Sequence, residues 1–192
     1  MTSGLRLIIH IRVKPMGKSM HLMEQRGRSL LVFAGKSEKP ESSLLAEAAA
    51  MFEAGGSVRL LDADLVFGID HIRSAFEKAS RAFDNDQNVS DSLATETMLY
   101  MSGCRQIQEA VDLFRLKGEG RAVVCLADTA KNSKERLKGG ISITEDEALL
   151  TDISKKDVHR FGIGNAEAGT VPDDKVADLV LERVAGVDVK RK

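Results

Sequence analysis

Two apolar patterns that meet at a Ser-Gly joint form the most informative stretch of this chain. From about Ser90 to Met101, apolar residues occupy most sides of a helix, which is typical of a helix buried all round. From about Cys104 to Leu116 they recur at i, i+3, i+4 and i+7, which predicts a helix with one buried face. The joint, Ser102-Gly103, therefore places the start of a new helix near the surface.

The start of that second helix is a candidate anion site. The first backbone amides of a helix have no acceptor within the helix, and Arg105 is expected to lie beside them. Such amides suit an anion, for example a phosphate group. A simpler interpretation is that Gly103 closes the first helix in the left-handed conformation and Ser102 caps the second. The two interpretations are compatible, because a capped turn still exposes amides.

Strand and helix patterns alternate along the rest of the chain. Buried strands are predicted at residues 29–34 and 121–127, and a strand-like segment with two aspartates at 58–67. Helices are predicted at 43–54, at 71–83 after a capping Asp70, and from a capping Thr170 to about Ala185. One or two further helices are expected within 145–162, and residues 129–140 form either a loop or a short helix.

The length and composition favour one domain. A chain of 192 residues has the usual size of a single domain, and its 43% of apolar residues can fill a core. The expected fold class is α/β or α+β, one sheet with helices packed on it. Residues 1–19 differ from the rest and are expected to be either an extra edge strand or a poorly ordered arm. The domain then covers 20–188, and a basic tail covers 189–192.

The charge balance excludes one class of function. A net charge of −1 and a pI near 6.4 argue against a protein that coats nucleic acid, so any RNA contact has to be local. No apolar run approaches the roughly 18 residues that span a bilayer, so no membrane partner is expected. Cys104 and Cys125 lack a pairing pattern and no secretory signal is recognised, which together indicate the cytoplasm.

The sequence contains no complete motif for nucleotide binding, metal binding or nucleophilic catalysis. Residues 35–37 and 17–19 are both Gly-Lys-Ser, which matches the last residues of a phosphate-binding loop. Neither is preceded by the earlier glycine that this loop requires. Residues 162–165 lack the third glycine of a dinucleotide site. The four histidines have no ligand spacing, and neither cysteine has the setting of a nucleophile. We therefore expect no catalytic residue, no metal, no cofactor and no small-molecule substrate, and thus a protein that is not an enzyme.

Five segments within roughly 57–187 share one resemblance: Val58–Gly68, His71, Ser92–Tyr100, Ser102–Ile107 and Ala177–Ala185. Together they resemble a known family, the kinase-binding subunits of the KEOPS (EKC) complex, also called the PRPK-binding protein (TPRKB) family. It implies an antiparallel sheet with helices on both faces. It also implies a regulatory subunit of the complex that adds the threonylcarbamoyl group to tRNA adenosine. Such a subunit binds the protein-kinase-like ATPase subunit and recruits tRNA through its 3′ CCA end.

The resemblance and the residue patterns together select candidate RNA-binding residues. Single-stranded RNA is held by a few phosphate contacts, base-edge hydrogen bonds and stacking. The candidates at the joint are Ser102, Gly103, Arg105 and Gln106, and those on the preceding helix are Arg73, Lys78 and Arg81. Cys104 stands where members of the family often have a basic residue, so this chain has one positive charge fewer there.

Two alternatives stay open. Glu96 lies within an apolar helix and needs a partner, so Arg105 either pairs with Glu96 or binds phosphate. Val180, Val184 and Val187 on the last helix are candidates for the kinase contact, and the alternative is that they fill the protein's own core. At the level of function, the alternative is a regulator of a kinase-like ATPase that acts through protein contacts and has no RNA site.

Overall fold

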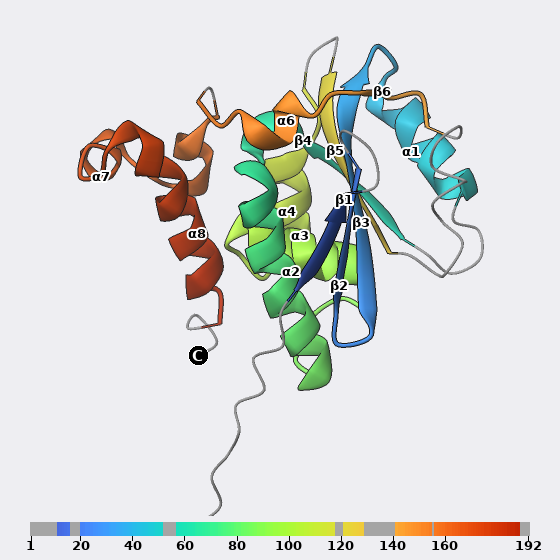
Figure 1. Ribbon diagram of the computed structural model, residues 1–192, viewed down its shortest axis with the longest axis horizontal. Helices are drawn as coiled ribbons and strands as arrows, with labels where there is room; N and C mark the ends of the chain where they lie inside the picture. The colour runs from blue at the N-terminus through green and yellow to red at the C-terminus, as the bar shows by residue number, and fades with distance from the viewer. Residues whose placement is uncertain are drawn as a thin grey trace, which may run out of the picture.

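The structure, a computed structural model, describes residues 11–15, 20–51, 57–117, 121–128, 141–154 and 156–188 (Figure 1). The strands are β1 Arg12–Pro15, β2 Met20–Gln25, β3 Arg28–Ser37, β4 Val58–Asp62, β5 Arg121–Asp128 and β6 Thr144–Glu145. The helices are α1 Glu41–Met51, α2 Gly68–Asp84, α3 Leu93–Ser102, α4 Ile107–Phe114, α6 Ala148–Thr151, α7 Asn165–Ala168 and α8 Val176–Gly186. Short 3-10 turns occur at Ala63–Leu65, Val158–Phe161 and Asp173–Lys175.

The strands form one antiparallel sheet in the order β1-β2-β3-β5-β4, with β6 paired to β3. Side chains alternate between its faces, as the period of a strand requires. On β3, Leu30 and Val32 belong to the larger apolar core, whereas Leu31 and Phe33 belong to a second core on the opposite face. Each face therefore has an apolar layer that helices can cover.

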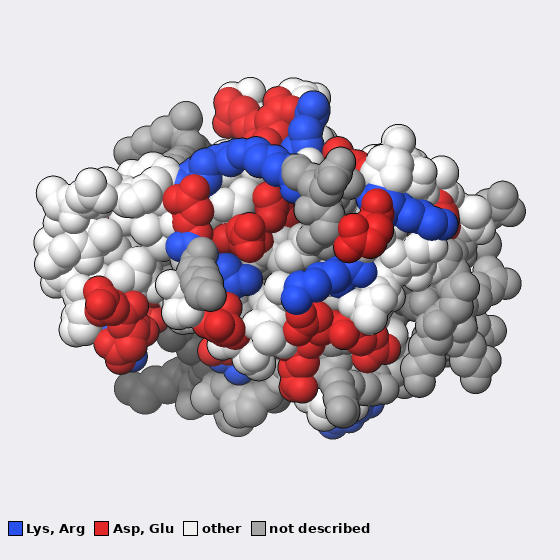
Figure 2. Space-filling view, turned by 90° about the horizontal axis from the view of Figure 1, so that it is seen from above, with Lys and Arg blue, Asp and Glu red and all other residues white. Residues whose placement is uncertain are grey.

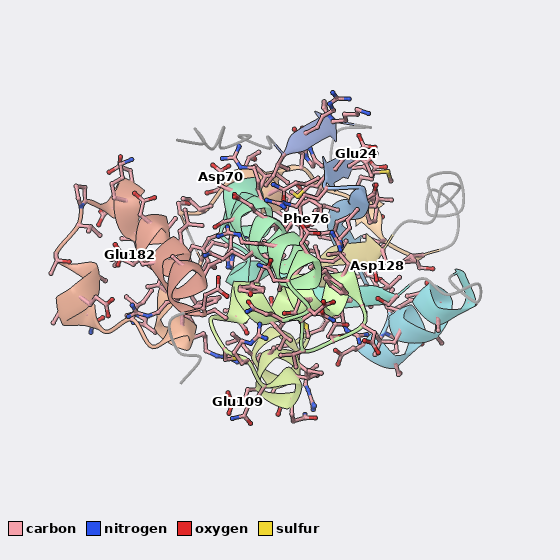
Figure 3. The ribbon with its side chains drawn as sticks, turned by 90° about the horizontal axis from the view of Figure 1, so that it is seen from below. Glu24, Asp70, Phe76, Glu109, Asp128 and Glu182 are labelled. Atoms are coloured by element: carbon pink, nitrogen blue, oxygen red, sulfur yellow. The ribbon has the colours of Figure 1, made fainter. Side chains whose placement is uncertain are left out.

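Helices cover both faces of the sheet. Figure 1 shows α2, α3 and α4 on one side of the strands and α1 on the other. On α2, a stripe that includes Ile72 and Phe76 is fully buried, and Figure 3 shows Phe76 directed from the helix toward the strands. Burial of such side chains stabilises the fold by about 1.5–3 kcal/mol each. The prediction of a single-domain α+β fold, an antiparallel sheet with helices on both faces, is confirmed.

Helix α8 forms a further layer outside α2 and α3, and its buried residues belong to the same core as theirs (Figure 1). Its start differs from the prediction. A 3-10 turn at Asp173–Lys175 precedes α8, which begins at Val176, so Thr170 does not cap it. Similarly, α2 begins at Gly68 with Phe67 at its N-cap, and Asp70 lies in the first turn. None of the described helices is long and apolar enough to cross a membrane.

The ends of the chain fall partly outside the description. Residues 12–15 form the edge strand β1, which pairs with β2, so this part of the N-terminal extension belongs to the sheet. The strand β2 itself was not predicted. The expected loop or helix at 129–140 and the basic tail at 189–192 lie outside the described residues.

Candidate functional site

The joint between α3 and α4 is a turn followed by an extended linker. Gly103 has φ +72° and its amide donates to the carbonyl of Tyr100 at 3.1 Å, so it closes α3 as predicted. A Cβ at Gly103 would lie 3.2 Å from Cβ of Arg183, because α8 covers the turn. Ser102 does not cap α4. Its hydroxyl donates to the carbonyl of Leu99 at 2.6 Å and accepts from the amide of Cys104.

Arg105 is paired with Glu96. Its Nη1 donates to Oε1 of Glu96 at 2.9 Å, its Nη2 donates to the carbonyl of Gln87 at 2.9 Å, and its guanidinium lies over the Tyr100 ring. The other oxygen of Glu96 accepts from the amides of Val89 and Ser90. The structure thus selects the structural role for Arg105 from the two that the sequence left open.

The start of α4 is exposed and uncapped. The helix begins at Ile107, three residues later than predicted, and the extended linker before it carries Arg105, which pairs with Glu96. Gln106 occupies the N-cap without a side-chain hydrogen bond, and Ile107 is 40% exposed. Within the described part of the chain, the amides of residues 107–109 donate to no protein acceptor. Figure 3 shows Glu109, in this first turn, at the outer edge of the molecule.

The predicted cations on α2 do not form one cluster. Arg73 pairs with Asp70 at 2.7 Å, Arg81 with Glu77 at 3.5 Å, and Lys78 with Asp188 at 3.7 Å. Arg73 and Arg81 are eight residues apart on one helix, which is about 12 Å. These three side chains therefore lie apart along α2, and each forms an ion pair with a carboxylate.

The three valines predicted to contact the kinase lie in the protein's own core. Val180, Val184 and Val187 each have an exposed fraction of 0%, and they pack in the same cluster as α2 and α3. This burial agrees with the alternative that the sequence left open, that these side chains fill the protein's own core, while the position of the kinase contact stays a prediction. The exposed stripe of α8 consists of Asp178, Glu182 and Ala185. Figure 3 shows Glu182 on this helix.

A buried histidine joins α2 to α3. His71 accepts from the amide of Phe67 through Nδ1 at 3.2 Å, and its Nε2 lies 3.0 Å from the carbonyl of Met101. Desolvation by burial lowers the pKa of His71 to about 4, and the hydrogen bond to Met101 opposes this shift. The imidazole is therefore neutral at pH 7, with its proton on Nε2. It has a structural role in this arrangement.

Among the described residues, two of the hollows lie away from this joint. One, of about 590 Å³, is lined by residues of 151–154 and 156–158 and by the 3-10 turn and start of α8. Lys156 in its wall donates to the carbonyls of Ala63 and Leu149, and burial lowers the pKa of this lysine. The other, of about 360 Å³, is lined by Arg12, Arg26 and Arg28 around the β2–β3 turn. Sequence reasoning missed these arginines, because their proximity depends on a hairpin that was not predicted.

The surface charges are interspersed. Figure 2 shows Lys and Arg beside Asp and Glu across the face seen from above, which fits a chain without a basic coat. The uncharged area at the left of this view is the end where Figure 1 places α7. Among the described residues, no group of three or more His, Cys, Asp and Glu is placed to hold a metal ion.

The fold is thus an antiparallel α+β sheet with helices on both faces, and it exposes the start of α4. The comparison with protein families is specific: the family described as kinase binding protein CGI-121 matches residues 38–186. The chain therefore belongs to this family of kinase-binding proteins, and the resemblance seen in the sequence is confirmed. No curated protein matches the chain.

Proposed function

We propose that this protein is a non-catalytic subunit of the KEOPS complex in tRNA threonylcarbamoyl-adenosine modification. It binds the protein-kinase-like ATPase subunit and recruits tRNA through the 3′ CCA end, in the cytoplasm and without a cofactor. Membership of the CGI-121 family supports the kinase-binding half. The observation that carries the RNA half is the uncapped, exposed start of α4.

The start of α4 has the chemistry of a small phosphate site. Three adjacent amides point out of the helix, and the helix dipole favours negative charge at this end. The side chain of Gln106 is exposed beside them and can form hydrogen bonds to a base edge. Tyr100 is only 1% exposed, so it does not stack on a base. Ile107, 40% exposed, offers the apolar contact instead.

The contributions of the joint residues differ from one another. Arg105 holds the linker in place through Glu96, and Gly103 lets the chain turn beneath α8. Ser102 fixes the end of α3 through its hydrogen bond to Leu99. These residues position the amides, and the phosphate contact falls to residues 106–109. Of the three cations on α2, Arg81 and Arg73 stay exposed enough to attract RNA, at 47% and 51% of the side chain.

The test combines RNA trimming with one substitution. A gel shift should detect binding of intact tRNA and a loss of at least about tenfold in affinity when the CCA end is removed. Gln106→Asp places a carboxylate at the N-cap, which stabilises α4 by about 0.5–2 kcal/mol and occupies the amides. We expect this variant to be more stable and to bind tRNA more weakly. Equal affinity for trimmed and intact tRNA would refute the CCA contact.

Gln106→Ser is the matched control, because it caps α4 without adding charge. It should stabilise the helix and leave RNA affinity closer to that of the wild type. Arg105→Glu is not a clean test of phosphate binding. It would leave the buried Glu96 facing a second carboxylate, so the fold would not stay intact.

For the kinase contact we propose the exposed stripe of α8. Glu182 gives this stripe a negative charge, Asp178 is paired with Lys175, and Ala185 leaves room for a partner side chain. Ala185→Arg keeps a residue of high helix propensity, so stability should change little. Binding to the kinase-like subunit, measured by calorimetry, should weaken at least about tenfold. Wild-type affinity in this variant would place the kinase contact on another surface.

A second function is favoured by a specific observation. Arg105 is engaged by Glu96, and Gly103 lies beneath Arg183, so the joint itself presents little positive charge. A regulator that acts through protein contacts alone would bind the kinase-like subunit and stimulate its ATPase activity. It would give no gel shift with tRNA at moderate salt. The same pair of assays separates the two functions.

A further inference from the structure

The β2–β3 turn carries a basic hollow that the match to the kinase-binding family does not include, since that match begins at residue 38. The hollow measures about 360 Å³ and is lined by Arg12, Glu24, Gln25, Arg26, Gly27, Arg28 and Ser29. Figure 1 shows this turn next to the C-terminal end of α2, at the lower side of the molecule. Three arginines from two neighbouring hairpins therefore share one concave surface.

The turn holds two of the arginines in fixed positions. Arg26 has φ +53° and Gly27 has φ +75°, the two-residue hairpin geometry in which Asn-Gly is the favoured pair. Arg26 thus occupies a conformation that side chains of its kind rarely adopt. Nη1 of Arg26 donates to Asp84 at 2.6 Å, Arg28 donates to the other oxygen of Asp84, and the Arg28 guanidinium lies over the Phe83 ring.

The charges of the hollow do not cancel. Asp84 receives both Arg26 and Arg28, and Glu24 pairs with Lys14 at 2.8 Å. Arg12 makes no ion pair with any residue that the structure describes. These four cations and two carboxylates leave a net charge of +2. Asp84 accepts a hydrogen bond from only one nitrogen of each guanidinium. Most N–H donors of Arg26 and Arg28 can therefore still bind a ligand.

We propose that this hollow binds a backbone phosphate of the recruited RNA, as a second contact beside the start of α4. The inference rests on the proposed function insofar as RNA is the partner. Arginine forks match the oxygens of a phosphate, and fixed guanidiniums lose little freedom on binding. Asp84 holds the arginines, and Gln87 accepts from Arg105, so both sites adjoin the same end of α2. Those two anchor residues are at most about 11 Å apart along the chain.

The test uses a double variant that is expected to keep its fold. Arg12→Ala removes a cation that has no described partner, and Arg26→Asn introduces the residue that this type of turn prefers. The full-length chain carrying both changes should unfold at the same or a higher urea concentration than the wild type. Its affinity for tRNA should fall about threefold to tenfold. The dependence of log affinity on log salt should become shallower by about one for each phosphate that the variant no longer binds.

The control removes the same number of charges elsewhere. Arg115→Ala with Lys175→Asn takes away two exposed, ion-paired cations that do not line the hollow. This control should retain the wild-type salt dependence. A drop in affinity equal to that of the test variant would overturn the proposal, because the effect would then be one of net charge alone. Wild-type affinity in the Arg12 and Arg26 variant would overturn it as well.

CCA-trimmed tRNA separates this proposal from the proposed function. The double variant should bind both intact and trimmed tRNA more weakly than the wild type does, whereas trimming by itself should abolish only the binding at α4. Competition identifies the ligand. An RNA oligonucleotide should displace tRNA from the wild type more effectively than polyglutamate at equal charge, and inorganic phosphate should act only at far higher concentration. Displacement by polyglutamate but not by RNA would assign the hollow to an acidic protein segment and overturn the proposal.

Discussion

Nη1 of Arg105 lies 2.9 Å from Oε1 of Glu96, whose side chain has an exposed fraction of 0%. Around this pair, the segment after α2, the helix α3 and the linker to α4 are joined, because Val89, Ser90 and Gln87 contribute backbone contacts. A buried carboxylate is costly unless it is paired and hydrogen-bonded. The two backbone amides and the Arg105 guanidinium supply the partners that this carboxylate needs.

Arg105→Met should destabilise the fold by about 3 kcal/mol, because Glu96 loses its cation while remaining buried. The partial exposure of Arg105, at 21% of the side chain, keeps the loss below that of a fully buried pair. Urea unfolding followed by circular dichroism measures it. Arg115→Met is the control, since the exposed pair with Asp112 is worth about 0.5 kcal/mol. Equal losses in the two variants would contradict a structural role for Arg105.

His71 should make stability depend on pH. The pKa of this buried imidazole is lowered from 6.5 to about 4 in the folded state, so the unfolded state binds the proton more tightly. Its contribution is therefore present above pH 6.5 and is lost as pH falls toward 4. The loss amounts to about 3 kcal/mol over this window.

The measurement compares urea unfolding at pH 7.5 and pH 5 in the wild type and in His71→Phe. The variant leaves Phe67 and Met101 without their partner, so it is expected to be less stable at both values. The prediction is tested only by the difference in unfolding free energy between pH 7.5 and pH 5. This difference should be smaller in the variant than in the wild type. An unchanged difference would show that other groups cause the pH dependence.

The sequence predicted those elements whose own residues determine them. The runs around Leu31 and Val124 are rich in β-branched and aliphatic residues, and the stripe on α2 has the period of a helix buried on one side. Gly103 was predicted from its residue type to close α3 in the left-handed conformation, and it does so with φ +72°. In these cases local preference and packing agree.

Elements that depend on pairing or packing with another element were not predictable. The residues of β2 have no strong strand pattern of their own, and the strand pairs with β3 across the Arg26-Gly27 turn. The spacing of Val180, Val184 and Val187 is the same for a docking stripe and for a core stripe. Whether α8 covers α2 and α3 decides between the two, and no local signal reports that.

Gly103→Ala should cost about 2 kcal/mol. A side chain at φ +72° is strained by about 1 kcal/mol, and the added Cβ would also lie 3.2 Å from Cβ of Arg183. Gly27→Ala is the control, because Gly27 has φ +75° and nothing within 4 Å of an added Cβ. The difference between the two variants in urea unfolding isolates the contact with α8. No difference would mean that α8 does not press on the joint.

Asp128 should stabilise the start of α3 from the end of β5. Its carboxylate accepts from the amides of Leu93 and Ala94, and from the hydroxyls of Ser57 and Ser92. Asp128→Ala leaves these donors without an acceptor and should cost about 3 kcal/mol. Asp128→Asn keeps the volume and one acceptor oxygen, so its loss should be about half as large. Urea unfolding measures both variants. If asparagine is as costly as alanine, the negative charge, and not the number of acceptors, holds the helix in place.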